Sequence, residues 1–260
     1  MTTTIALAGK GGTGKTTIAA MITRYLVEHG AGTVLAIDAD PSANLNLALG
    51  MPLVRTLGDI REGMLANVNK VTGAVNGNPG MDKFAYLDME IEYALVEGKN
   101  VDLLAMGRPE GPGCYCAVNH ILRDIVDRMG RSYDYLVIDN EAGMEHLSRR
   151  TTRDVDLLFV VTDPTVRGVV AAARIAALRD ELDINIKQAY LLVNRVQGAL
   201  SPALEAAVAD VGIPLGALLP SDPSVTAADA EGRPLVELGA DSVVYGAVSD
   251  LLQKTLVAAA

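Results

Sequence analysis

The sequence predicts an α/β protein with a mostly parallel central sheet of about seven to eight strands and helices on both faces. Short, nearly continuous apolar runs alternate with helical patterns along most of the chain, as they do where parallel strands are buried on both sides. A glycine-rich stretch joins the first apolar run to the first helical pattern. The 260 residues, 50% of them hydrophobic, suffice for one sizeable core, and no repeat or linker interrupts them. We therefore expect a single domain over residues 1–260.

Seven segments are expected as strands because they are short, apolar and often β-branched. They cover residues 5–8, 33–37, 101–106, 135–138, 155–162, 189–194 and 214–219. Ligands of parallel sheets bind beyond the carboxyl ends of the strands. Polar residues stand at four of these ends and predict a binding site there: Asp38, Asp139, Thr162 and Asn194.

Eight stretches with helical patterns are expected between or after these strands. They cover residues 16–29, 42–49, 56–66, 118–129, 165–182, 199–211, 223–231 and 241–258. Glycine, proline and asparagine are frequent in residues 67–80, which predicts an irregular surface excursion. The pattern of residues 81–93 is ambiguous.

Residues 9–17 read GKGGTGKTT and fit the phosphate-binding pattern G-x-x-x-x-G-K-[ST], between a strand and a helix as that motif requires. Glycines let backbone N–H groups wrap around phosphate oxygens, and the following helix adds the positive end of its dipole. We expect Lys15 to bridge the β- and γ-phosphates and the Thr16 hydroxyl to ligate Mg²⁺. The motif thus predicts a site for ATP or ADP with Mg²⁺, a bare glycine turn being the alternative. Its expected contacts are Gly11, Gly12, Thr13, Gly14, Lys15, Thr16 and Thr17.

Two acidic segments follow expected strands and bring carboxylates to the same site. We expect Asp40 to position the attacking water and Asp38 to lie in the outer shell of the metal. Asp139 is expected to hold a water bound to Mg²⁺, and the backbone N–H of Gly143 to sense the γ-phosphate. Ordinary turns and strand-to-helix loops are the alternatives.

Asn194 and Arg195 close one expected strand and Pro220 follows another, so these three residues are expected on the base side of the nucleotide. The Asn194 amide carries both a donor and an acceptor, which matches the edge of adenine; a turn asparagine at a strand end is the alternative. The Lys-x-Asp that follows such an asparagine in common GTPases is missing here, so we predict ATP over GTP.

The formal net charge of −10 weighs against a nucleic-acid partner, because binding a phosphate backbone needs a basic face. No apolar run approaches the roughly 20 residues of a membrane span. The first strand begins at the N-terminus and leaves no room for a signal peptide. We therefore expect a cytoplasmic protein without a nucleic-acid or membrane partner.

The only two cysteines, Cys114 and Cys116, are separated by one residue. In a reducing compartment such a pair is expected to bind metal or do redox work rather than form a structural disulfide. Two thiolates grip one side of a metal ion, and a second copy facing them across a two-fold axis would complete a four-sulfur shell. A pair of small buried hydrophobes is the alternative. His120, four residues after Cys116, is an alternative ligand.

Lys10, directly after the first glycine, makes the loop resemble the deviant Walker A class, which includes MinD, ParA and the nitrogenase iron protein. The resemblance implies that Lys10 reaches across a homodimer interface to the partner's nucleotide and acts there with Lys15, Asp38 and Asp40. A solvated lysine beside a glycine turn is the alternative.

Together with this loop, residues 106–108, 113–116 and 139–147 make nearly the whole chain resemble the CooC-type maturation ATPases. The resemblance implies a homodimeric ATPase that helps install nickel in carbon monoxide dehydrogenase; the sister group serving acetyl-CoA synthase is similar. In this reading Cys114 and Cys116 of two protomers share one Ni²⁺, and the same thiolates accept Zn²⁺.

Two other functions stay open. One is a scaffold for a [4Fe–4S] cluster, which four thiolates across a dimer also suit. The other is a positioning ATPase of MinD type, which needs a basic amphipathic C-terminal helix for membranes. Residues 251–260 contain one basic residue, Lys254, so we rank this function third.

Overall fold

A computed structural model describes residues 2–68, 83–107, 124, 127–142, 154–178 and 185–259. Within these ranges the strands form one sheet in the order β3-β4-β2-β5-β1-β6-β7-β8. Their bounds are β1 (Thr3–Gly9), β2 (Val34–Asp38), β3 (Val96–Glu97), β4 (Val101–Ala105), β5 (Tyr135–Asp139), β6 (Asp154–Thr162), β7 (Asn185–Val196) and β8 (Leu215–Pro220). Every pairing is parallel except that of β3 with β4. The predicted mostly parallel sheet is confirmed.

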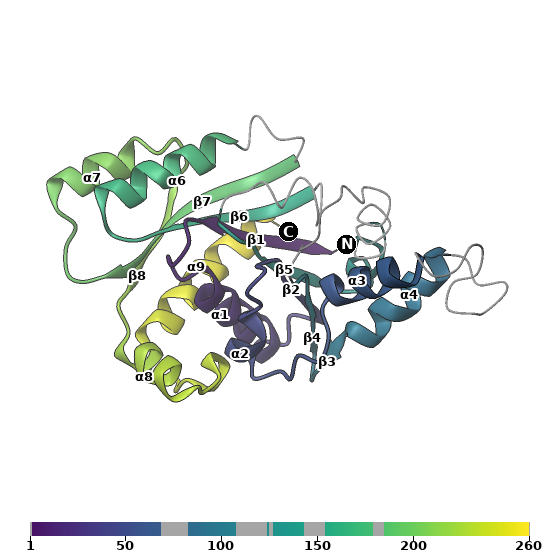
Figure 1. The fold of residues 1–260 in the computed structure, drawn as a ribbon. Helices are drawn as coiled ribbons and strands as arrows, with labels where there is room; N and C mark the ends of the chain where they lie inside the picture. Colours follow the sequence, from purple (N-terminus) through teal and green to yellow (C-terminus); the bar gives the residue numbers. More distant parts are fainter. Residues whose placement is uncertain are drawn as a thin grey trace.

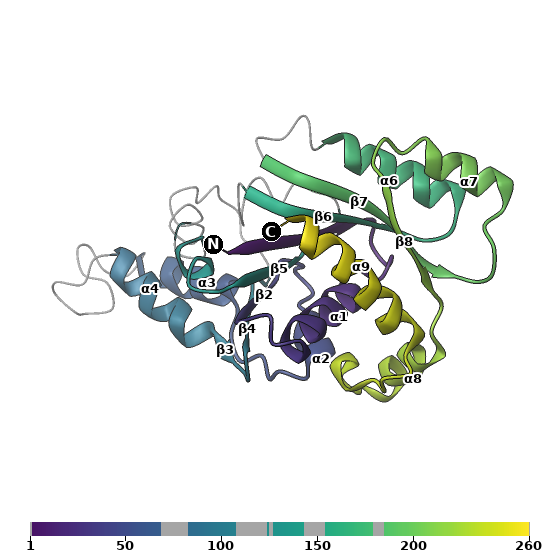
Figure 2. The same cartoon turned by 180° about the vertical axis from the view of Figure 1, so that it is seen from behind.

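Helices cover both faces of the sheet, as predicted (Figures 1 and 2). On one face lie α3 (Leu57–Val68), α4 (Lys83–Ala94), α6 (Val166–Leu178) and α7 (Pro202–Ala209). On the other lie α1 (Lys15–Glu28), α2 (Leu45–Leu49), α8 (Pro223–Glu231), the 3₁₀ turn η2 (Leu235–Glu237) and α9 (Val243–Ala259). The part of the chain that the structure describes contains no helix that is both long and apolar enough to cross a membrane.

The two faces of the sheet have separate apolar cores because successive strand residues point to opposite sides. In β6, Leu158 and Val160 pack under the α6 face, whereas Leu157, Phe159 and Val161 pack under α1 and α9. All five side chains are fully buried. This double burial explains why the strand reads as a continuous apolar run.

Several boundaries differ from the expectations. The short strand β3 was not predicted, since two residues carry no periodic pattern and pair with β4 through tertiary contact alone. Residues 81–93 correspond largely to helix α4. Helix α2 starts at Leu45 rather than at residue 42, because Ala43 has a left-handed φ of 46° that no helix accommodates. Most of the expected excursion at 67–80 and of the expected helix at 118–129 lies outside the described residues.

The core of the α1 face provides a stability prediction. Leu157→Ala removes a fully buried side chain and should lower the free energy of unfolding by about 2–5 kcal/mol, because the cavity adds to the lost burial. Urea unfolding followed by circular dichroism measures this loss. The matched control is Leu47→Ala on α2, where the side chain is 67% exposed and the change should stay within about 0.5 kcal/mol. Equal losses in the two variants would contradict the described core.

Candidate nucleotide-binding site

Three adjacent parallel strands deliver the expected site residues to one edge of the sheet. The register places Leu7 of β1 and Asp38 of β2 on either side of Asp139 of β5. The glycine-rich loop leaves β1 at Gly9 and runs into α1 at Lys15. The predicted loop and the carboxylates at the ends of β2 and β5 therefore lie together, although more than 100 residues separate Asp38 from Asp139 in the sequence.

The loop needs glycine at Gly9 and Gly14 because its neighbours are too close for a side chain. A Cβ on Gly9 would lie 2.2 Å from the carbonyl oxygen of Val161, and a Cβ on Gly14 would lie 2.3 Å from Nδ2 of Asn194. Gly14 also has a φ of 94°, a conformation that residues with side chains rarely adopt. The loop is thus fitted tightly against the ends of β6 and β7.

Lys15 lies beneath the loop and is 6% exposed. Its Nζ donates to the carbonyl oxygens of Gly9 and Lys10, each at 3.3 Å. Burial lowers the pKa of Lys15, while the charges of Asp139, Asp40 and Glu141 act in the opposite direction. A poorly solvated ammonium group has strong affinity for phosphate oxygens.

Asp139 is buried and only partly satisfied. Its Oδ2 accepts a hydrogen bond of 2.5 Å from the Thr16 hydroxyl, while its buried Oδ1 has no hydrogen-bond partner among the described residues. The pKa of Asp139 is raised to about 7, chiefly by burial and also by the nearby charge of Asp38, against the opposing effects of Thr16 and Lys15. A nearby cation would stabilise the ionised form of such a carboxyl group.

These oxygens fit Mg²⁺. The ion prefers oxygen ligands and binds through one or two protein groups together with substrate phosphates. Thr16 would hold it directly, and Asp139 would hold one of its waters. When bound, Mg²⁺ would neutralise charge on the β- and γ-phosphates.

Asp38 and Asp40 have different surroundings. Asp38 is 1% exposed, and its carboxylate accepts backbone N–H groups of Asp40 at 3.0 Å and Leu45 at 2.8 Å. Burial raises the pKa of Asp38 to about 6, and these two hydrogen bonds act against the rise. Asp40 is half-buried and accepts the Ser42 N–H at 2.8 Å. Asp38 therefore organises the turn that presents Asp40, and the water-positioning role of Asp40 stays a prediction.

Asn140 was not among the expected site residues. Its side chain is buried, and its Nδ2 donates to the Leu7 carbonyl oxygen at 2.8 Å, which ties the end of β5 to β1. Its Oδ1 is buried and has no hydrogen-bond partner in the part of the chain that the structure describes. The sequence offered one signal, a polar residue directly after the apolar strand and Asp139, but no indication of its partner.

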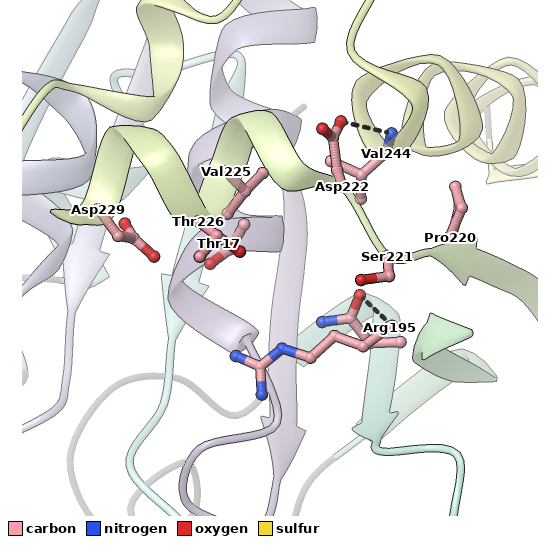
Figure 3. Close-up of a pocket in the computed structure, with 10 residues that line it drawn as sticks. Thr17, Arg195, Pro220, Ser221, Asp222, Val225, Thr226, Asp229 and Val244 are labelled. Carbon is pink, nitrogen blue, oxygen red and sulfur yellow. Dashed lines mark hydrogen bonds between the residues drawn. The ribbon is translucent and has the colours of Figure 1, made fainter. Parts of the chain in front are cut away.

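The expected base-side residues Asn194, Arg195 and Pro220 line one pocket beside the loop, to which α1 contributes Thr17. Figure 3 shows Thr17, Arg195 and Pro220 around this pocket. Two of the base-side residues also contact the loop itself. Asn194 Nδ2 donates to the Thr13 carbonyl oxygen at 2.8 Å, and an Arg195 guanidinium nitrogen donates to the Gly12 carbonyl oxygen at 2.9 Å. Neither contact was expected from the sequence.

Asp222 fixes the part of the pocket lining that follows Pro220 and Ser221. Its carboxylate accepts the Ser224 N–H at 2.9 Å at the start of α8 and the Ser242 hydroxyl at 2.7 Å before α9. Burial favours a raised pKa at Asp222, but the hydrogen bonds from Ser224 and Ser242 outweigh it and the pKa is lowered. The ionised carboxylate thus joins two helices next to Pro220.

Four other expected site residues, Cys114, Cys116, His120 and Gly143, lie outside the described residues. Lys10 is described, and its side chain is exposed at the loop.

The fold and this loop define a P-loop nucleotide-binding protein. Residues 4–235 match the family described as CbiA, the CobQ/CobB/MinD/ParA nucleotide binding domain. The chain belongs to this family, whose members are ATPases, and it is itself a P-loop ATPase.

The relatives of this chain include uncharacterized proteins and proteins of two different named functions. An uncharacterized ATP-binding protein of Methanocaldococcus jannaschii is 40% identical over 252 residues, covering 97% of this chain and 98% of the relative. The carbon monoxide dehydrogenase accessory protein CooC of Rhodospirillum rubrum is 33% identical over 245 residues, covering 90% of this chain and 89% of the relative. Among solved structures, the septum site-determining protein MinD of Pyrococcus horikoshii, complexed with Mg-ADP, has a TM-score of 0.68 at 25% identity and covers 98% of this chain and 96% of its own.

The raised pKa of Asp139 predicts a pH dependence of stability. Between about pH 4 and 7 the folded, nucleotide-free protein keeps a proton that the unfolded chain has lost, so stability falls as the pH rises through this window. Asp139→Asn stays neutral and should stabilise the protein more at pH 8 than at pH 5. Urea unfolding at both pH values measures the difference.

A surface carboxylate serves as the control for this experiment. Asp241→Asn, at an exposed position, should change stability equally at the two pH values. An equal gain in stability from Asp139→Asn at pH 5 and pH 8 would contradict a pKa of Asp139 that burial raises.

Proposed function

We propose that this ATPase is a homodimeric nickel-insertion factor that serves carbon monoxide dehydrogenase or the related acetyl-CoA synthase. The observation that carries the proposal is the Cys114-Tyr115-Cys116 segment in a chain 33% identical to a carbon monoxide dehydrogenase accessory protein over nearly its full length. Nickel is the cargo here, bound by thiolates, which suit soft and borderline metals. Each protomer supplies two of the four sulfurs.

The exposed position of Lys10 supports a dimer. The Lys10 carbonyl oxygen accepts the Thr13 hydroxyl at 2.9 Å and Lys15 Nζ at 3.3 Å, so the backbone is anchored while the side chain points outward. An anchored, exposed cation beside the phosphate loop can reach the nucleotide of a facing copy. Two-fold pairing then places equivalent cysteines together as well.

The nucleotide cycle would regulate the pairing. Lys15 and the loop N–H groups bind the phosphates, and Asp40 orients a water toward the γ-phosphate. Loss of that phosphate removes its contacts with Lys10 of the facing copy and with the segment after Asp139. The dimer then loosens and the metal passes to the client enzyme.

Two other candidates rest on specific observations. The same four thiolates suit a [4Fe–4S] cluster, so a cluster scaffold is the second candidate. The similarity to MinD structures makes a positioning ATPase the third. Lys254 is the only basic residue of the C-terminal ten, which gives α9 little attraction for an anionic membrane surface.

Replacing both cysteines should abolish nickel binding. Equilibrium dialysis of the wild-type protein with ATP should give one Ni²⁺ per dimer, and Cys114→Ser with Cys116→Ser should give none, because the sulfur ligands are gone. ADP affinity in the double variant should stay within about twofold of the wild type, since the loop is untouched. Retained nickel would refute the metal site. A brown, anaerobically purified protein absorbing near about 400 nm would favour the cluster scaffold instead.

Replacing Lys10 should separate dimerisation from nucleotide binding. Lys10→Ala should abolish dimerisation driven by a non-hydrolysable ATP analogue, because the charge that crosses to the facing copy is lost. ADP binding to the monomer should change by less than about threefold. Sedimentation velocity and calorimetry measure the two quantities. Lys254→Ala, another exposed lysine, should dimerise normally; dimerisation of Lys10→Ala would contradict the crossing role.

A further inference from the structure

The phosphate-binding loop depends on the orientation of its peptide groups. A peptide group is planar and trans, so its carbonyl oxygen and the following N–H point in opposite directions. Anchoring the carbonyl of one loop residue therefore fixes the direction of the next residue's N–H. A loop whose carbonyls are held on its outer side presents its N–H groups to the phosphates.

The carbonyls of the first half of the loop are anchored by the loop's own residues. Lys15 Nζ binds the carbonyls of Gly9 and Lys10, and the Thr13 hydroxyl also binds that of Lys10. Lys15 must also serve the phosphates, so its contacts are shared between the loop and the ligand.

The carbonyls of the second half are anchored from outside, by the end of β7. Asn194 Nδ2 holds the Thr13 carbonyl at 2.8 Å and Arg195 holds the Gly12 carbonyl at 2.9 Å. These two carbonyls precede the N–H groups of Gly14 and Thr13. The Asn194 amide is itself fixed, since it is 5% exposed, its Oδ1 accepts the Arg195 N–H at 2.9 Å, and its Nδ2 lies against Gly14.

We propose that Asn194 and Arg195 are positioning residues that hold the second half of the phosphate loop in its binding conformation, so that they determine phosphate affinity whatever base is attached. The Asn194 amide already uses one donor and one acceptor in hydrogen bonds within the chain. Recognition of the adenine edge is therefore a secondary role of this side chain. This inference rests on the ATPase site alone and is independent of nickel.

Backbone strain at Arg195 adds support. Arg195 has a φ of +57°, in the left-handed region that an arginine rarely occupies. Glycine would adopt this conformation without cost, yet only a long donor reaches Gly12 from here. The strained residue therefore has its side chain in contact with the loop.

The test uses a ligand without a base. Binding of Mg²⁺ with inorganic tripolyphosphate, with ATP and with GTP is measured by calorimetry in Asn194→Ala and the wild type. Loss of one buried hydrogen bond should weaken all three ligands by a similar factor of about 3–10. Loss for ATP alone, with tripolyphosphate unchanged, would make Asn194 a base reader and overturn the proposal, as would no loss for any ligand. Asn185→Ala, at the other end of β7, is the matched control and should bind all three ligands normally; its exposed amide bonds Asp154.

Arg195→Gly separates binding from folding. Glycine relieves the left-handed strain, so the melting temperature should stay the same or rise, while tripolyphosphate affinity should fall about 3–10-fold. Arg195→Lys keeps a donor and should recover part of the affinity. Full tripolyphosphate affinity in Arg195→Gly would overturn the role of Arg195 in holding the loop, even if Asn194→Ala failed to fold.

Discussion

Burial of charge at the carboxyl edge of the sheet is the constraint on which the site depends. The in-register pairing of β2 with β5 sets Asp38 opposite Asp139, and the loop after β1 adds Lys15 to the same buried region. Burial raises the pKa values of both carboxyls and lowers that of Lys15, so each charge is held where water solvates it poorly. The three groups offset one another only in part. A polyphosphate with its Mg²⁺ would supply charges of both signs to this region.

The surrounding hydrogen bonds keep this charged cluster open to a ligand. Asp38 is occupied by backbone N–H groups, Asn140 joins β5 to β1, and the end of β7 holds the outer side of the loop. The unfavourable desolvation of the carboxyls is therefore not relieved by collapse of the loop onto them. Because the site is already ordered without nucleotide, less ordering free energy is lost when the ligand binds.

Much of the fold followed from local pattern. Continuous apolar runs such as Leu157–Val161 predicted strands buried on both faces, and the ends of those runs predicted the binding edge. The antiparallel strand β3 was not predicted, because its two residues are too few to show a periodic pattern and form a strand only by pairing with β4. The motifs predicted which residues meet at this edge of the sheet, namely Lys15, Thr16 and the strand-end aspartates Asp38 and Asp139, while their roles stay predictions. The contacts of Asn194 with Thr13, 181 residues away, depend on the order of strands in the sheet, and no spacing in the sequence reports that order.

Proton release on ligand binding tests most directly whether the buried carboxyl group of Asp139 loses its proton when the nucleotide and its cation bind. Calorimetric titration with Mg-ADP at pH 6.5 in buffers of different ionisation enthalpy counts the protons released, and the same titration of Asp139→Asn subtracts the contribution of the nucleotide itself. With a pKa of about 7 in the free protein, Asp139 should release a substantial fraction of one proton at pH 6.5 and almost none at pH 8.5. Equal release by the wild type and Asp139→Asn at pH 6.5 would contradict the coupling between this buried charge and nucleotide binding.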